Sequence, residues 1–179
     1  TVRDIGSCTV GLIGYGNIAK RVETIVTAMG ATVVHTNTRG AQGHPGWRTL
    51  PDLLAVSDVV SLHLPLTEHT EGMLDAAALS RMKPGAVLVN TSRGAVIDEP
   101  ALVSALQHGP LQAAGLDVFA TEPVDAANPL LKLDNVVVSP HTTWYTADTM
   151  HRYLAEAVGN CERLAAGQQL ANVVNEVNL

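Results

Sequence analysis

Residues 8–19, with the sequence CTVGLIGYGNIA, decide the fold. The first six of them, Cys8–Ile13, form a short apolar run of the kind that is buried in a parallel β-sheet. The turn Gly14–Gly16 follows without a spacer, and apolar residues then recur at helical spacing until Gly30, which stands where a helix is usually capped. The stretch therefore predicts a strand, a tight glycine turn and a helix in immediate succession.

The rest of the chain repeats this alternation of strands and helices. Five further strands are predicted, at Ala31–Thr36, Asp58–Leu62, Ala86–Asn90, Ala113–Val118 and Asn135–Ser139. Helices are predicted at Leu50–Leu54, at Leu74–Met82, from a cap at Asp98 to about His108, and at Met150–Ala165. Because parallel neighbours need a crossover, which is usually a helix, the pattern predicts a doubly wound parallel α/β sheet of the Rossmann type.

Composition favours one domain and argues against several kinds of ligand. The chain has 179 residues, of which 46% are apolar and only 3% aromatic, so a single aliphatic core is expected across residues 1–179. Its net charge is −6, and its 11 basic residues are scattered, which argues against nucleic acid. The sequence has neither an apolar run of about 18 residues nor a signal peptide, so no membrane partner and a cytoplasmic location are expected.

The two cysteines, Cys8 and Cys161, fall in apolar periodic segments and lack the spacing of metal ligands. They are expected to be buried thiols, and no metal site is predicted.

The glycine turn also matches a dinucleotide-binding motif, because Gly14-Tyr15-Gly16-Asn17-Ile18-Ala19 fits the G-x-G-x-x-G/A fingerprint. The first Gly permits the tight turn, the second lets the backbone approach a pyrophosphate, and the small sixth residue allows close packing of helix on strand. Backbone amides near Asn17 and Ile18, at the start of the helix, would point at the anion. The position between a strand and a helix favours a dinucleotide cofactor.

The end of the second strand bears on which dinucleotide is bound. A carboxylate that holds the adenosine ribose is expected about 20 residues after the turn, but Asn37 occupies that place, followed by Thr38 and Arg39. Because Asn37 does not repel a 2′-phosphate and Arg39 adds a positive charge, NADP is favoured and NAD stays possible. The alternative is that Arg39 is only a solvated loop charge.

Three further strings place polar groups after strands: Asn90-Thr91-Ser92-Arg93-Gly94, Asp117-Val118-Phe119 with Glu122-Pro123, and Ser139-Pro140-His141. Open α/β sheets bind ligands at the carboxyl ends of their strands. Arg93, Glu122 and His141 are therefore candidates for one site, although each alone could be a turn or surface residue.

Together with the glycine turn, these strings resemble the D-isomer-specific 2-hydroxyacid dehydrogenases over nearly the whole chain. The resemblance implies that Arg93 holds the substrate carboxylate and polarises the keto oxygen, that His141 is the acid/base, and that Glu122 pairs with His141. It further implies that Asp117 anchors the nicotinamide carboxamide. The other expected cofactor contacts are His63, Leu64, Pro65, Thr70, Thr91 and Ser92, together with Arg93 and His141.

The resemblance also implies a substrate domain that is not in this sequence, so these residues alone are expected to bind dinucleotide but to turn over poorly. Two alternatives stay open. One is a dinucleotide-sensing module like the family's corepressor members; the other is a different Rossmann enzyme, such as one acting on an adenosyl thioether. A homodimer is expected, with the last helix, Trp144 and Tyr145 as contributors.

Overall fold

The computed structural model describes residues 4–38, 40 and 43–173. They form two compact units that divide between His141 and Thr142. The first unit holds all the strands, and the second consists of helix α5 (Ala147–Ala165) and the residues beside it.

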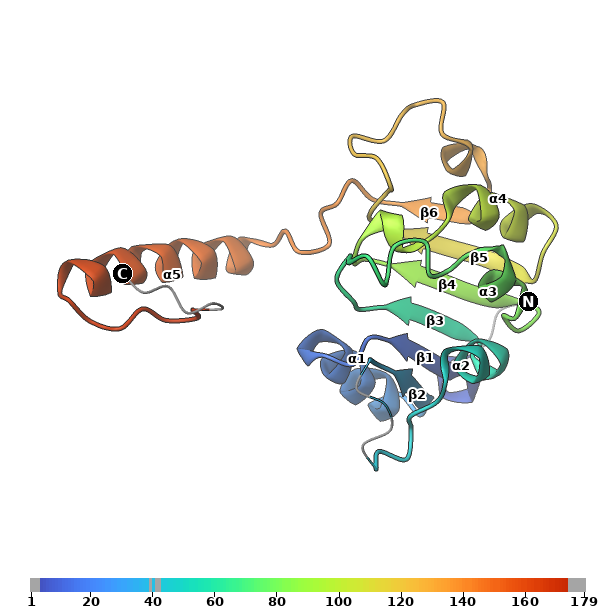
Figure 1. The fold of residues 1–179 in the computed structure, drawn as a ribbon, viewed down its shortest axis with the longest axis horizontal. Helices are drawn as coiled ribbons and strands as arrows, with labels where there is room; N and C mark the ends of the chain where they lie inside the picture. Colours follow the sequence, from blue (N-terminus) through green and yellow to red (C-terminus); the bar gives the residue numbers. More distant parts are fainter. Residues whose placement is uncertain (1–3, 39, 41–42, 174–179) are drawn as a thin grey trace. The chain divides into compact units, whose positions relative to one another are not determined.

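The first unit is built on a sheet of six parallel strands, in the order β2-β1-β3-β4-β5-β6. The strands are β1 (Thr9–Ile13), β2 (Thr32–Thr36), β3 (Val59–Leu62), β4 (Ala86–Asn90), β5 (Leu111–Leu116) and β6 (Val136–Val138). All six arrows in Figure 1 point the same way, so the loops that follow the strands leave from one edge. The order reverses between β1 and β3, the place where such sheets bind dinucleotides.

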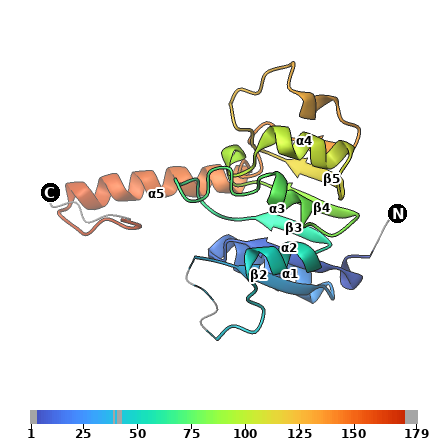
Figure 2. The ribbon, with the colours of Figure 1, turned by 45° about the vertical axis from the view of Figure 1, so that its right-hand side comes forward.

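Helices pack on both faces of this sheet, which confirms the predicted doubly wound α/β fold. The helices of this unit are α1 (Asn17–Ala28), α2 (Leu50–Val56), α3 (Ala76–Ser80) and α4 (Glu99–Gln107), with short 3₁₀ turns η1 (Ile5–Ser7), η2 (Gly94–Val96) and η3 (Pro129–Lys132). Val10 and Leu12 of β1 share a core cluster with Ala19 of α1. Ile13 points to the other face and joins the larger cluster, which contains buried side chains of α2, α3 and α4. Figure 2 shows the ribbons of these three helices beside the sheet.

The predicted helix at Leu74–Met82 is shorter in the structure, because local side-chain and bridge contacts outweigh the apolar pattern. The Asp75 side chain accepts the Ala78 backbone N–H at 2.8 Å and starts α3 at Ala76. Leu74 is fully buried and pairs with Ile97 in an isolated bridge. The predicted cap at Asp98 is confirmed, since its carboxylate accepts the Ala101 N–H at 3.0 Å.

Strand β5 covers Leu111–Leu116 rather than the predicted Ala113–Val118. Its pairing with β4 starts at Leu111 and ends where Leu116 lies opposite Asn90. Asp117 therefore follows the strand instead of lying inside it, which places its side chain at the ligand edge.

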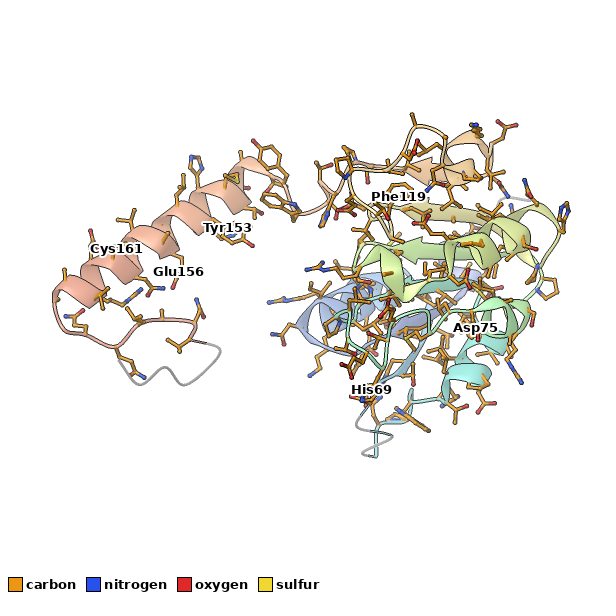
Figure 3. All side chains as sticks on the ribbon, turned by 45° about the horizontal axis from the view of Figure 1, so that its top comes forward. His69, Asp75, Phe119, Tyr153, Glu156 and Cys161 are labelled. Carbon is orange, nitrogen blue, oxygen red and sulfur yellow. The ribbon has the colours of Figure 1, made fainter. Side chains whose placement is uncertain are left out.

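Taken by itself, the second unit leaves α5 without a buried residue. Thr146 caps the helix by accepting the Thr149 N–H at 3.1 Å, and Gly167 follows its end. The prediction of a buried Cys161 is wrong: this thiol is exposed, whereas Cys8 is buried as expected (Figure 3). The apolar stripe of α5 lacks a cover within its own unit. No helix among the described residues is long and apolar enough to cross a membrane.

Candidate active site

Gly14 and Gly16, the two glycines of the turn, have different surroundings. Gly14 has φ +88°, and a Cβ there would lie 2.4 Å from the His63 carbonyl oxygen, so no side chain fits. A Cβ at Gly16 would meet no atom within 4 Å. The first glycine packs the turn against the end of β3, and the second leaves open space beside the start of α1.

This open space suits a pyrophosphate group. Helix α1 begins at Asn17, so the first backbone N–H groups of the helix face the space beside Gly16 without intrahelical acceptors. Ala19 is fully buried and lets the helix approach β1, as predicted for the small sixth residue. Ile18 keeps 70% of its surface exposed at the same place and is available to a ligand ring. The donor set therefore fits the phosphates of a dinucleotide.

The loop after β3 lies against the glycine turn. The His63 N–H donates to the Ile13 carbonyl at 2.7 Å, and burial lowers the pKa of His63 from 6.5, which keeps its ring neutral. Thr70 is buried, and its hydroxyl donates to the Pro65 carbonyl at 2.8 Å. Of these predicted cofactor residues, His63 and Leu64 lie next to Gly14, while the buried Thr70 side chain stabilises the loop through its hydrogen bond to Pro65.

Asn37 and Thr38 follow β2 directly, at the predicted adenosine end of the site. Arg39, the residue whose charge favours NADP, lies outside the described residues.

Asn90 shapes the loop that presents Arg93, a role that sequence reasoning missed. Its side chain is fully buried; Oδ1 accepts both the N–H and the hydroxyl of Ser92 at 2.9 Å, and Nδ2 donates to the Arg93 carbonyl at 2.9 Å. Both ends of the amide are used, so Asn90 ties the backbone of Ser92 and Arg93 to the end of β4. An asparagine at the carboxyl end of a buried strand was the available signal. Arg93 itself is exposed, and Thr91 lies beside it at the same edge.

Gly94 brings this loop against the one after β5. A Cβ at Gly94 would lie 1.9 Å from the carbonyl carbon of Phe119, the buried residue labelled in Figure 3. Only glycine permits this backbone contact, which places the Arg93 loop beside the Glu122 loop.

Replacing Gly94 by alanine is expected to force the two loops apart and to lower the free energy of unfolding by about 2 kcal/mol or more. Urea unfolding followed by circular dichroism measures this. Gly115→Ala is the matched control, because its Cβ would meet only Val89 Cγ2 at 4.0 Å. Equal midpoints for the two variants would contradict the close contact.

Glu122 and His141 form the predicted pair. Glu122 Oε2 lies 2.7 Å from His141 Nδ1, and Glu122 Oε1 accepts the Phe119 backbone N–H at 3.0 Å. The hydrogen bond from the Phe119 N–H, followed by the hydrogen bond to His141, lowers the pKa of Glu122 from 4.5. Burial acts in the opposite direction, and the charges of His141 and Arg93 lower the pKa by smaller amounts. The close contact of Gly94 with Phe119 places the loop of Arg93 beside the loop of Glu122, and Glu122 holds His141, so all three predicted catalytic residues lie at one edge of the sheet.

The lowered pKa gives a pH prediction. A carboxylate that the native state holds ionised contributes stability above its unfolded value of about 4.5, and that contribution is lost as pH falls through the lower native value. We expect a ¹³C NMR titration of the Glu122 carboxyl to give a midpoint below pH 4.5. The chemical shift of the Phe119 amide, which donates to this carboxylate, should change with the same midpoint. A midpoint at or above 4.5 would show that the pair does not form.

The backbone of His141 is held in an unusual conformation, with φ 54°. Its N–H donates to the Asp117 carbonyl at 2.8 Å, and Asp117 Oδ1 accepts the Ser139 hydroxyl at 2.5 Å. A non-glycine residue at positive φ is uncommon and concentrates at functional sites. Ser139, which sequence reasoning quoted without a role, thus ties Asp117 to the end of β6.

A cavity of about 590 Å³ opens beside this pair and is lined by Asp117, Ser139, Glu122 and His141 on its polar side. Phe119, Pro123, Val124, Leu131, Val138 and Pro140 complete its wall. Within the described residues, no group of three or more His, Cys, Asp or Glu side chains could hold a metal ion. The arrangement can bind a small organic molecule and exchange a proton with it.

Comparison with known proteins identifies the family of the chain. The profile of the family described as "D-isomer specific 2-hydroxyacid dehydrogenase, NAD binding domain" matches residues 1–143. Over 176 residues the chain is 40% identical to a glyoxylate reductase of Aeropyrum pernix, covering 93% of this chain and 51% of that protein. It is 38% identical over 171 residues to a hydroxypyruvate reductase of Blautia hydrogenotrophica, covering 93% and 53%.

A solved structure is also similar: an acyclic imino acid reductase in complex with NADPH and D-Arg superposes with a TM-score of 0.86 at 36% identity, covering 98% of this chain and 56% of that one. The chain thus spans about half the length of the relatives that it matches. The family profile and these identities show that the chain belongs to the D-isomer-specific 2-hydroxyacid dehydrogenase family, of which it carries the NAD-binding domain.

Proposed function

We propose that this chain is the dinucleotide-binding half of an enzyme that reduces small 2-keto acids to D-2-hydroxy acids and catalyses the reverse oxidation. The observation that carries the proposal is the hydrogen bond of 2.7 Å between Glu122 and His141, on the sheet edge that also holds the glycine turn. A sensor of dinucleotides needs the glycine turn but has no use for a paired acid/base. The pair therefore favours an enzyme over the corepressor-like alternative.

Each catalytic side chain has a distinct task. A bound nicotinamide ring supplies the hydride for the keto carbon, or accepts it from the hydroxy acid. Arg93 binds the substrate carboxylate with its planar fork of donors and polarises the keto oxygen. Because Nδ1 of His141 faces Glu122, Nε2 is the nitrogen that gives the keto oxygen its proton and takes it back in the oxidative direction. Glu122 fixes the orientation of that ring.

The names of the relatives point to glyoxylate and hydroxypyruvate as the substrate class. Groups that select the substrate side chain belong to the substrate domain that the resemblance implies. The test is a screen of small 2-keto acids with NADPH and with NADH, using the intact protein that includes these residues. Turnover with one of them supports the proposal; tight dinucleotide binding without turnover of any 2-keto acid favours a sensor.

NADP is the cofactor that we propose as preferred, because Asn37 replaces the carboxylate that would repel a 2′-phosphate. Solved relatives are bound to NAD in some cases and to NADPH in another, so the preference rests on Asn37. We expect the dissociation constant of NADPH to be about tenfold below that of NADH, which corresponds to about 1.4 kcal/mol. Titration of each dinucleotide by fluorescence measures the ratio. Equal or tighter binding of NADH would refute the preference.

A homodimer is also proposed, in the reducing environment of the cytoplasm. Leu154, Val158 and Leu164 of α5 are 59%, 57% and 60% exposed, an apolar stripe that supports association. Analytical ultracentrifugation of the intact protein measures the oligomeric state, and a monomer at micromolar concentration would refute the dimer.

A further inference from the structure

Four polar side chains outside the catalytic set form a connected chain beside the glycine turn. Glu23 belongs to α1, Tyr15 to the turn, His35 to β2, and His44 to the loop that follows β2. The Tyr15 ring stacks on the His35 ring with centroids 3.6 Å apart and an interplanar angle of 7°. We call these four residues the turn–loop network.

The hydrogen bonds of the turn–loop network run in one direction. The Gly46 N–H donates to His44 Nδ1 at 3.2 Å, so Nδ1 is an acceptor, and His35 Nε2 must donate to it across 2.8 Å. The neutral His44 ring then carries its proton on Nε2, which donates to the Tyr15 hydroxyl at 3.3 Å. That hydroxyl in turn donates to a Glu23 carboxylate oxygen. One tautomer of each imidazole satisfies the whole chain.

The surroundings keep these groups in the required protonation states. His35 is 1% exposed, and burial first, then the neighbouring His44, lower its pKa from 6.5, although Glu23 acts in the opposite direction. Burial and the hydrogen bond to Glu23 raise the pKa of Tyr15 to about 12, so its hydroxyl stays a donor.

Two cations lie nearby. Lys20 Nζ is 5.7 Å from the centre of the Tyr15 ring. Arg48 donates to the carbonyls of Pro45 and Trp47 rather than to the network. Within the described residues, Glu23 is therefore the acidic member of the network, and Lys20 is the cation that faces its Tyr15 ring.

The turn–loop network holds His44, in the loop after β2, to Tyr15 of the glycine turn and to His35 of β2. This loop starts at Asn37, at the predicted adenosine end of the cofactor site. The chain leaves β2 through Asn37 and returns alongside it: the His35 N–H donates to the Gly46 carbonyl at 2.9 Å, and the Arg48 N–H donates to the His35 carbonyl at 2.9 Å. The Gly14 N–H donates to the Thr36 carbonyl at 3.0 Å, which ties the turn to the same strand end. The pyrophosphate turn and the ribose end are thus joined through one set of side chains.

We infer that the turn–loop network positions Asn37 and Thr38, the described residues directly after β2, beside the glycine turn and makes dinucleotide affinity fall in mild acid. Tyr15, Glu23, His35 and His44 act here as positioning residues. The inference rests on the dinucleotide site of the proposed function and is independent of the reaction and its substrate.

The acid dependence follows from the direction of the hydrogen bonds. A proton added to His44 Nδ1 would face two donors, and a proton added to His35 would charge a buried ring. A proton on His44 Nδ1 removes the acceptor of the hydrogen bond from His35, whereas a proton on the buried His35 Nδ1 keeps that bond but leaves a charged, unpaired N–H and so destabilises the network. Because the pKa of His35 is lowered in the native state, its ring stays neutral at pH 6.5 and above, and the network is lost as pH falls through that lower native value.

The test measures NADPH and NADH affinity of the intact protein between pH 5.5 and 8 for the wild type, Tyr15→Phe and His44→Asn. Tyr15→Phe keeps the stacked ring and removes only the hydroxyl that joins His44 to Glu23. We expect about tenfold weaker binding of both dinucleotides at pH 8 and a flatter decline toward pH 5.5 than in the wild type. Tyr153→Phe on α5, whose side chain is 63% exposed, is the matched control and should leave the profile unchanged.

Two results would overturn the inference. One is a wild-type affinity that does not change with pH. The other is a Tyr15→Phe profile parallel to the wild type, even if the variant unfolds at a lower temperature, because a purely structural role would give that pattern. Wild-type protein that binds neither dinucleotide at pH 8 would refute the cofactor site itself, and the inference with it.

Discussion

Replacing His141 by asparagine is expected to lower kcat for 2-keto acid reduction by about 10²–10⁴-fold, the usual contribution of a positioned general acid. Asparagine cannot give up a proton to the keto oxygen, but it tolerates the positive φ of this position better than most residues. The fold and the dinucleotide site should therefore survive. Steady-state kinetics of the intact enzyme, with dinucleotide titration alongside, separates the two effects.

His108→Asn is the matched control, because His108 is exposed at the end of α4 and far from the strand ends that carry the site. Its kcat should equal that of the wild type. If His141→Asn also keeps near-normal activity, the chemistry does not pass through this histidine. A different class of Rossmann enzyme would then be favoured.

Replacing Arg93 by methionine is expected to lower kcat/KM for the keto acid by about 10²–10³-fold. The loss corresponds to one or two charge-assisted hydrogen bonds of about 1.5–3 kcal/mol each, between the guanidinium and the substrate. Arg93→Lys should recover only part of it, since an ammonium cannot form the planar fork. The variants are compared by initial rates over a range of keto acid concentrations.

Arg81→Met provides the control, because Arg81 lies at the end of α3 and outside the site. It should leave kcat/KM unchanged. A kcat/KM for Arg93→Met within threefold of the wild type would mean that another residue binds the substrate carboxylate.

Most of the fold could be predicted because its signals are local. The strand, turn and helix of residues 8–29 follow one another without a gap, and the apolar periods identify each later strand. The shortened α3 could not be predicted from periodicity, because the Asp75 cap and the Leu74–Ile97 bridge decide its start. The exposure of Cys161 was missed for a related reason: an apolar stripe does not say what covers it.

For the site, the sequence predicted which residues take part and that they lie at the carboxyl ends of the strands, but it did not predict the contacts among them. The resemblance implies that Glu122 pairs with His141, and the structure shows that the pair is formed by Glu122 Oε2 and His141 Nδ1. The close contact of Gly94 with Phe119 joins loops that are 25 residues apart, which no local pattern reveals. Likewise, no sequence motif links His35 to His44, and only the fold shows that they share a hydrogen bond.

The configuration of the product tests most directly whether Arg93, Glu122 and His141 perform D-2-hydroxy acid chemistry. The intact enzyme is supplied with hydroxypyruvate and reduced dinucleotide, and the product is resolved by chiral chromatography. We predict D-glycerate alone, with its formation slowed together with dinucleotide oxidation by about 10²–10⁴-fold in His141→Asn. An L product, an equal mixture, or wild-type protein that binds dinucleotide but oxidises none in the presence of any small 2-keto acid would contradict the proposed function.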